Sequence, residues 1–174
     1  GKAVMNAVKT GLRPSDILTP KAIRNAVAVD NAIGASTNSV LHLLALAGEM
    51  GMSQEEFSVF TFNEVSEKVP HLCKLAPAGE HYIEDLNEAG GISAVIRRLE
   101  EAGLFDGTAM TVSGVTQHER VKNARVLNDE VIRPMDAPYS KTGGLAILKG
   151  NLASEGAVVK KGAVDPAMLK HSGP

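Results

Sequence analysis

Hydrophobic positions in the first part of the chain recur with a helical period. They predict one helix over residues 1–9 that ends at Gly11, and another over residues 20–33 with Thr19 as its N-cap. Gly34 follows the last apolar position, where helices commonly end in a glycine. Two helices joined by a short turn are therefore expected here.

A polar turn then precedes the most apolar segment. Only His42 interrupts the hydrophobic run from Val40 to Ala47, so we expect a helix that is buried over most of its circumference. Ser36, Thr37 and Asn38 fall at its N-terminus, where unpaired N–H groups are capped by a side-chain oxygen or hold an anion. The local pattern favours capping.

The helical pattern continues through the middle of the chain. The run Ser53-Gln-Glu-Glu56 has the composition of a capping box and predicts a helix that extends to about Lys68. Further helices are expected over residues 82–87 and 92–101, the second of which is amphipathic and stops at Gly103.

After Gly107 the pattern becomes extended. Short β-prone pieces at residues 111–112 and 131–132, and apolar runs at residues 145–148 and 157–159, predict strands. Helices followed by strands predict an α/β chain with two parts.

The change of pattern also predicts the domain boundary. We expect a helix-rich first domain over residues 1–108, and a linker with the first strands of a second domain over residues 109–174. The opening helix has no cap before it, so we expect a piece of a longer protein.

Composition narrows the classes of function. The chain has 174 residues, of which 44% are hydrophobic, and a net charge of −2. It lacks the clustered basic residues of a nucleic-acid-binding surface, and its apolar runs are too short to span a bilayer. It also has no signal-peptide pattern, so we expect a cytoplasmic protein without nucleic-acid or membrane partners.

Few residues offer chemistry of their own. The single cysteine, Cys73, excludes an internal disulfide and any all-cysteine metal or iron–sulfur site built by this chain alone, and a buried thiol is its favoured state. For His42, a buried, hydrogen-bonded histidine is favoured over a ligand or a general acid or base. The other histidines have no zinc-like spacing and are expected at the surface: His71, His81, His118 and His171.

Two glycine-containing segments are candidate anion sites. Gly143-Gly144 and Gly150-Asn151 could direct backbone N–H groups at an anion, yet neither belongs to a phosphate-binding motif. Tight turns between strands are the favoured interpretation.

Several strings, in this order, resemble the dihydroxy-acid and phosphogluconate dehydratase family. They are Asn31-Ala-Ile-Gly-Ala-Ser-Thr-Asn-Ser-Val-Leu-His-Leu-Leu-Ala45, Asp85-Leu-Asn-Glu-Ala-Gly-Gly-Ile92, Val131-Ile-Arg-Pro134, Gly143-Gly-Leu-Ala-Ile-Leu-Lys-Gly-Asn-Leu-Ala153, Gly156-Ala-Val-Val-Lys160 and His171-Ser-Gly-Pro174. The Leu-His-Leu-Leu-Ala form resembles the branched-chain amino-acid branch of the family more than its sugar-acid relatives. One departure is Ala35, where the family usually has a second glycine.

The resemblance implies a hydro-lyase that converts 2,3-dihydroxy carboxylic acids to 2-keto acids in isoleucine and valine biosynthesis. It also implies an iron–sulfur cluster and Mg²⁺ in the intact enzyme, because hydroxide is a poor leaving group that a metal must stabilise. The family's cluster cysteines, metal ligands and base serine belong to motifs outside this segment. We therefore assign no catalytic or metal residue here, and expect the isolated chain to be inactive and to bind no cofactor.

The resemblance further implies the end of an N-terminal α/β domain joined to the opening strands of a C-terminal, swivelling-type β-barrel, with the active site between them. The intact enzyme is expected to form a homodimer or a larger assembly. Residues expected to line the cleft for the dihydroxy acid are Ser36, Thr37, Asn38, His42, Gly150 and Asn151. The alternatives are a sugar-acid or phosphogluconate dehydratase, or a non-catalytic assembly or anion-binding module.

Overall fold

The computed structural model describes residues 1–173 and shows an α/β chain with eight α-helices and a two-stranded antiparallel sheet in that range. Pro174, the end of the last family string, lies outside the described residues. The elements are α1 (Lys2–Thr10), α2 (Pro14–Ile17), α3 (Pro20–Ile33), α4 (Asn38–Glu49), α5 (Thr61–Ser66), α6 (Ile83–Glu88), α7 (Gly91–Glu101), α8 (Gln117–Val121), β1 (Leu145–Gly150), β2 (Ala153–Lys160) and the 3-10 helices η1 (Lys161–Ala163) and η2 (Pro166–Leu169).

Helix ends follow the local signals in the first part of the chain. The Thr19 side chain accepts a hydrogen bond from the backbone N–H of Ala22 at the start of α3. Gly11 and Gly34 adopt left-handed conformations at the ends of α1 and α3, with φ of 70° and 57°. The predicted helices over residues 1–9 and 20–33 are confirmed, as are those at α6 and α7.

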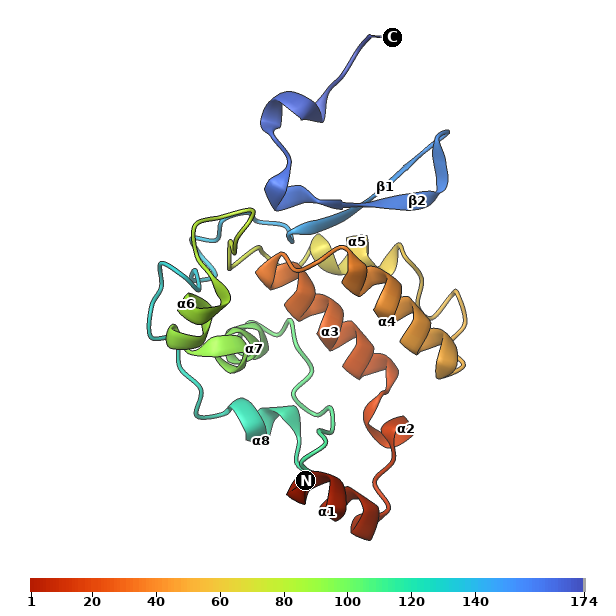
Figure 1. Cartoon of the computed structure of the whole chain (residues 1–174), viewed down its shortest axis with the longest axis vertical. Coiled ribbons are helices and arrows are strands. Elements are labelled where there is room, and N and C mark those ends of the chain that lie inside the picture. Colours follow the sequence, from red (N-terminus) through yellow and green to blue (C-terminus); the bar gives the residue numbers. More distant parts are fainter. Residues whose placement is uncertain (174) are drawn as a thin grey trace.

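The expected burial of α4 is wrong. Val40 and Ala47 are its only buried residues, whereas Leu41 is 64% exposed. Figure 1 shows the reason: α4 lies at the edge of the helical layer beside α3, so its outer face has no neighbouring element. An apolar composition therefore did not mean burial within this chain.

The helix expected from Ser53 to about Lys68 is also wrong in extent. The capping box forms, because the Ser53 N–H donates to Glu56 Oε2 at 2.8 Å, but it starts only a turn. The Ser58 N–H then donates to the side chain of Thr61 instead of continuing a helical ladder, and α5 covers only Thr61–Ser66.

Two of the four expected strands are wrong. Residues 110–116 form a tight turn in which the Thr111 N–H donates to the Val115 carbonyl, and residues 131–132 lie in a turn whose side chains enter the core. Helix α8 was not predicted, although Thr116 and Glu119 form its capping box. The strands at residues 145–148 and 157–159 are confirmed in β1 and β2.

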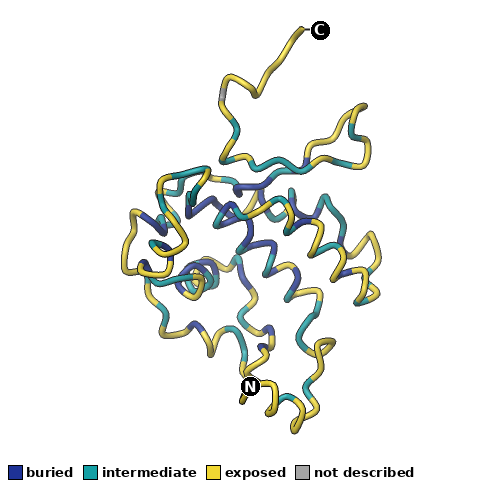
Figure 2. The backbone as a smooth tube through the Cα atoms, viewed as in Figure 1, coloured by how far each residue is buried: buried dark blue, intermediate teal, exposed yellow. Residues whose placement is uncertain are grey.

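Two hydrophobic clusters hold these elements together. One surrounds α7 and includes Leu72, Leu86 and Leu99, and the other joins α3, α4 and α5 to β1 through residues such as Phe62 and Leu145. Figure 2 shows the buried backbone concentrated in α3 and α7, with the hairpin outside. In the range that the structure describes, no helix is long and apolar enough to cross a membrane.

Polar bonds fix the hairpin to α5. The Asn63 side chain both accepts from the Ile147 N–H at 2.7 Å and donates to the Ile147 carbonyl at 2.8 Å. Ser66 donates to the Leu145 carbonyl at 2.9 Å. The hairpin is therefore held in one register against the helices.

Candidate functional site

A hollow of about 510 Å³ lies among α3, α4 and α7. Its walls are mainly apolar, and Asp30, Ser39 and His42 supply polar groups. An apolar hollow with a few convergent polar groups is the usual form of a small-molecule site. This hollow is one candidate site in the chain.

Asp30 is the most perturbed carboxyl group at this hollow. It is 7% exposed, and the Ser39 hydroxyl donates to its Oδ2 at 2.6 Å. Burial raises the pKa of Asp30 from 3.8 to about 6, although the Ser39 bond and the charge of Lys160 act in the opposite direction. A carboxyl group with such a pKa can exchange a proton near neutral pH. Pattern reasoning missed it, because an aspartate on an amphipathic helix is usually solvated.

The interpretation of His42 as a buried, hydrogen-bonded histidine is wrong. The residue is exposed on α4 and lies at the wall of the hollow.

At the start of α4, Ser36 provides the cap that the sequence pattern favours. The Asn38 N–H donates to Ser36 Oγ at 3.2 Å, and Thr37, the residue before the helix, makes no side-chain cap bond. The structure thus places Asn38 about one turn before His42 on α4, and Ser36 and Thr37 in the turn that leads into this helix.

Gly150 and Asn151 lie at the tip of the hairpin. Leu152 beside them is 99% exposed, and in Figure 1 the tip projects away from the helices. The structure therefore brings His42 to the hollow with Asp30 but does not bring the hairpin tip there. A role for all six residues as cleft lining stays a prediction.

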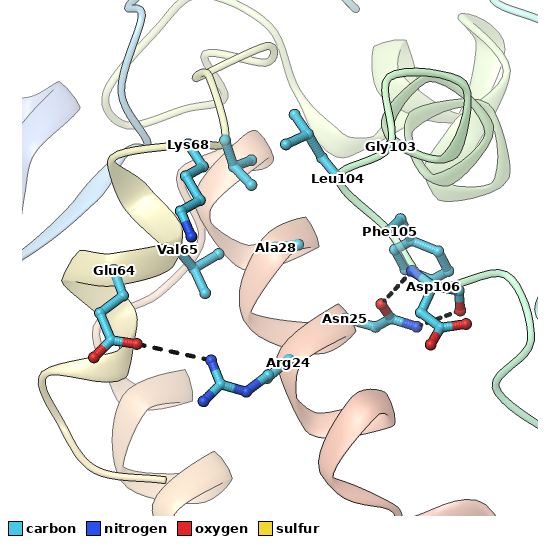
Figure 3. A pocket seen from close by; sticks show the side chains of 11 residues that line it. Arg24, Asn25, Ala28, Glu64, Val65, Lys68, Gly103, Leu104, Phe105 and Asp106 are labelled. Atoms are coloured by element: carbon cyan, nitrogen blue, oxygen red, sulfur yellow. Dashed lines mark hydrogen bonds and ion pairs between the residues drawn. The ribbon is translucent and has the colours of Figure 1, made fainter. Parts of the chain in front are cut away.

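A second hollow of about 320 Å³ separates α3 from α5 and the segment after α7, as Figure 3 shows. The Asn25 amide donates to the Asp106 carbonyl and accepts from its N–H, both at 2.8 Å. Arg24 and Glu64 form an ion pair at 3.8 Å across the opening. Both ends of the Asn25 amide are engaged, so this arrangement positions the segment after α7 against α3.

The expectation that His71 lies at the surface is wrong. The residue is 4% exposed, because Val69, Leu72 and Cys73 around it all enter the core. These apolar neighbours were the signal that could have predicted its burial. Desolvation by burial lowers the pKa of His71, so the ring is neutral at pH 7.

Glycines enclose the His71 ring. A Cβ atom at Gly34, Gly144 or Gly162 would lie 2.4, 3.1 or 2.9 Å from its nearest ring atom. The N–H groups of Gly143 and Gly144 donate to the carbonyls of Ser66 and Asn31. Those N–H groups are therefore occupied within the chain. The pair lies in a bend before β1, so the expected tight turn between strands is wrong for Gly143-Gly144.

The residues present do not fit an iron–sulfur cluster or a magnesium site. Cys73 is the single cysteine of the chain and is fully buried, so the chain supplies at most one of the several thiolates that hold a cluster. Within residues 1–173, no group of three His, Cys, Asp or Glu side chains is placed to hold a metal ion. We derive no chemical step through either group from this chain.

Comparison with known proteins extends over nearly the whole chain. The family model described as dihydroxy-acid/6-phosphogluconate dehydratase N-terminal matches residues 1–120, and the corresponding C-terminal model matches residues 130–174. Proteins named dihydroxy-acid dehydratase from Acetivibrio thermocellus and Moorella thermoacetica are 55% and 53% identical over 174 residues, which is 100% of this chain. One from Ignicoccus hospitalis is 53% identical over 173 residues, or 99% of the chain.

These relatives are longer proteins. The chain spans 31% of the length of each of the three. The N-terminal family model alone covers more than half of this chain. The chain therefore belongs to the dihydroxy-acid/6-phosphogluconate dehydratase family.

Proposed function

We propose that this chain forms part of a hydro-lyase that dehydrates a 2,3-dihydroxy carboxylic acid to a 2-keto acid in branched-chain amino-acid biosynthesis. The observation that carries the proposal is the similarity of the chain, at 50–55% identity, to eight proteins that are all named dihydroxy-acid dehydratase. Loss of hydroxide from the 3-position needs a Lewis acid, and loss of the 2-proton needs a base.

In the proposed enzyme, residues outside this chain bind the iron–sulfur cluster and Mg²⁺. The cysteine count supports that division, because the single thiol of Cys73 cannot supply the several thiolates that a cluster needs. The resemblance of the chain to its family further supports a cytoplasmic enzyme that forms a homodimer or a larger assembly. What this chain contributes is the folded support, with α3, α4 and the hairpin positioned against one another.

A chimeric enzyme tests the proposal. Residues 1–174 replace the matched 31% of the Acetivibrio thermocellus relative, and the purified, cofactor-loaded chimera is assayed with 2,3-dihydroxy-3-methylbutanoate and with 6-phosphogluconate. We expect turnover of the branched dihydroxy acid within about tenfold of the parent enzyme, because a segment with 55% identity preserves the packing around the site.

The two substrates separate the proposal from its main alternative. A folded, loaded chimera that prefers 6-phosphogluconate would assign the segment to the sugar-acid branch. A folded, loaded chimera without activity on either acid would contradict a supporting role in dehydration. The parent enzyme, prepared in parallel, controls for cofactor loading.

The isolated chain is expected to show no dehydration of either acid. After reconstitution with iron and sulfide it should also retain no stoichiometric iron, because Cys73 is buried and no three-residue ligand group occurs within residues 1–173. Iron and acid-labile sulfide analysis after gel filtration checks this result. Retention of a cluster by the isolated chain would refute the proposed division of roles.

A further inference from the structure

A hollow of about 240 Å³ beside His71 is not accounted for by the proposed function. Its walls come from three segments that are distant in sequence: Lys74 after α5, Tyr139 and Ser140 before β1, and Lys161 after β2. Residues 71–74 lie in the part matched by the N-terminal family model, and residues 139–162 in the part matched by the C-terminal model. The hollow therefore joins the two matched parts of the chain.

Backbone bonds hold two of these segments together. The His71 N–H donates to the Ser140 carbonyl, and the Tyr139 N–H donates to the His71 carbonyl, both at 2.9 Å. The Arg133 guanidinium lies 5.0 Å from the centre of the Tyr139 ring and fixes its orientation. The walls of the hollow are thus positioned before any ligand arrives, which lowers the entropic cost of binding.

The hollow carries positive charge without a matching carboxylate. Among the described residues, neither Lys74 nor Lys161 has an Asp or Glu oxygen within 4.0 Å, and the Lys161 ammonium donates only to the Thr142 hydroxyl. Lys160 adds a third positive charge that acts on the His71 ring. Like charges lining a concave, low-dielectric wall concentrate anions.

The ring of His71 forms a buried part of the wall of this hollow. Its side chain is buried, and within the described part of the chain its Nε2 has no hydrogen-bond partner. Nε2 faces Gly34 and Gly144, whereas the Cε1–Nδ1 edge of the ring faces Gly162 at the hollow. The ring therefore contributes its Cε1–Nδ1 edge to the wall of the hollow, while the unpaired Nε2 is turned away from it.

We propose that this hollow binds the oxyanion group of a small acid, a carboxylate or a phosphate, between the ammonium groups of Lys74 and Lys161. The Ser140 hydroxyl is a further donor, and the Cε1–Nδ1 edge of the His71 ring lies at the wall beside it.

A neighbouring hollow of about 480 Å³ shares Lys74 and Tyr139 and is also lined by Glu80 and Glu130, so any part of the ligand that extends into it carries no second negative charge. Anion binding at the hollow beside His71 depends on the lysine charges and not on dehydration chemistry. The anion-site proposal and the proposed function can therefore fail independently of each other.

Titration of the 174-residue chain with two probes tests the site. Inorganic phosphate and isobutyrate are added at constant ionic strength and pH 7, and binding is followed by calorimetry and by the Cε1–H resonance of His71. We expect saturable binding of at least one probe, with a parallel shift of that resonance. Saturation by phosphate alone assigns a phosphate group to the ligand, and saturation by isobutyrate assigns a carboxylate.

Lysine variants identify the charges that bind the anion. Lys74→Met and Lys161→Met are each expected to weaken binding about tenfold, because each removes one charge-assisted hydrogen bond. Lys9→Met, on the exposed surface of α1, removes the same charge elsewhere and is expected to leave the affinity unchanged. Circular dichroism confirms that each variant is folded.

A glycine variant tests the geometry of the hollow. Gly162→Ala places a Cβ atom 2.9 Å from His71 Cε1, so we expect it to weaken binding while both lysines remain. The proposal is overturned if neither probe saturates at tens of millimolar, or if Lys9→Met weakens binding as much as Lys74→Met and Lys161→Met. Lys74 is half-buried and Lys161 is exposed, so neither variant removes a core side chain, and the two variants still test the proposal if Gly162→Ala does not fold.

Discussion

The Gly34→Ala substitution is expected to lower the free energy of unfolding by about 3 kcal/mol, against about 1 kcal/mol for Gly11→Ala. Both glycines end a helix in the left-handed region, with φ of 57° and 70°, where alanine costs about 1 kcal/mol. Only Gly34 also meets a buried ring, because its Cβ atom would lie 2.4 Å from His71 Nε2, whereas no atom lies within 4 Å of that position at Gly11. The difference between the two variants therefore measures the contact with His71.

Urea denaturation of the two single variants gives that difference directly. A double variant, Gly34→Ala with His71→Ala, removes the overlap, so its loss of stability should be smaller than the sum of the two single losses. Equal losses for Gly34→Ala and Gly11→Ala would mean that the ring moves aside freely. That outcome would contradict the rigid enclosure of His71.

Helix ends were predictable because their causes are local. Thr19 caps α3 with its own side chain, and Gly11, Gly34 and Gly103 adopt positive φ, which few other residues tolerate. These features need only a few neighbouring residues, so the printed sequence contains all the information. The hairpin was predictable for a similar reason, since the apolar runs in β1 and β2 flank a short polar turn.

Burial was less predictable because it depends on distant partners. The outer face of α4 is as apolar as a core helix, yet no described element covers Leu41. Val131 and Ile132 are β-branched residues, as is typical of a strand, but they lie in a turn. Their side chains pack into the hydrophobic cluster around α7, and this packing does not require strand pairing of their backbone. Composition alone does not distinguish these cases.

The candidate sites show the same division between local and distant causes. The sequence pattern predicted candidate site residues at the start of α4, and one of them, His42, lines the hollow among α3, α4 and α7. Among the described residues, the burial of the Cys73 thiol was expected, whereas the burial of Asp30 and His71 was missed, because segments from elsewhere in the chain complete it. For His71 these are Gly144 and Gly162, more than seventy residues away in the sequence.

Asp30→Asn is expected to stabilise the chain at pH 7 by about 3 kcal/mol, because the native carboxyl group has a pKa of about 6 in place of 3.8. The unfolded chain loses this proton near pH 3.8 and the folded chain near pH 6. Native stability therefore falls as the pH rises through that interval, and the full penalty is present above it. Asparagine carries no charge, and its amide can donate to Ser39, which leaves the Ser39 hydroxyl to donate to the Ser36 carbonyl at 2.5 Å.

Urea denaturation between pH 4 and pH 7 measures this effect. The stability of the parent chain should decline across the interval relative to that of Asp30→Asn, and the two curves should converge at the acidic end. Asp136→Asn, at an exposed position, removes the same charge and is expected to follow the parent curve. If Asp30→Asn also followed the parent curve, the Asp30 carboxyl group would have to be hydrated in the folded chain. The pH profile thus tests the burial of Asp30 directly.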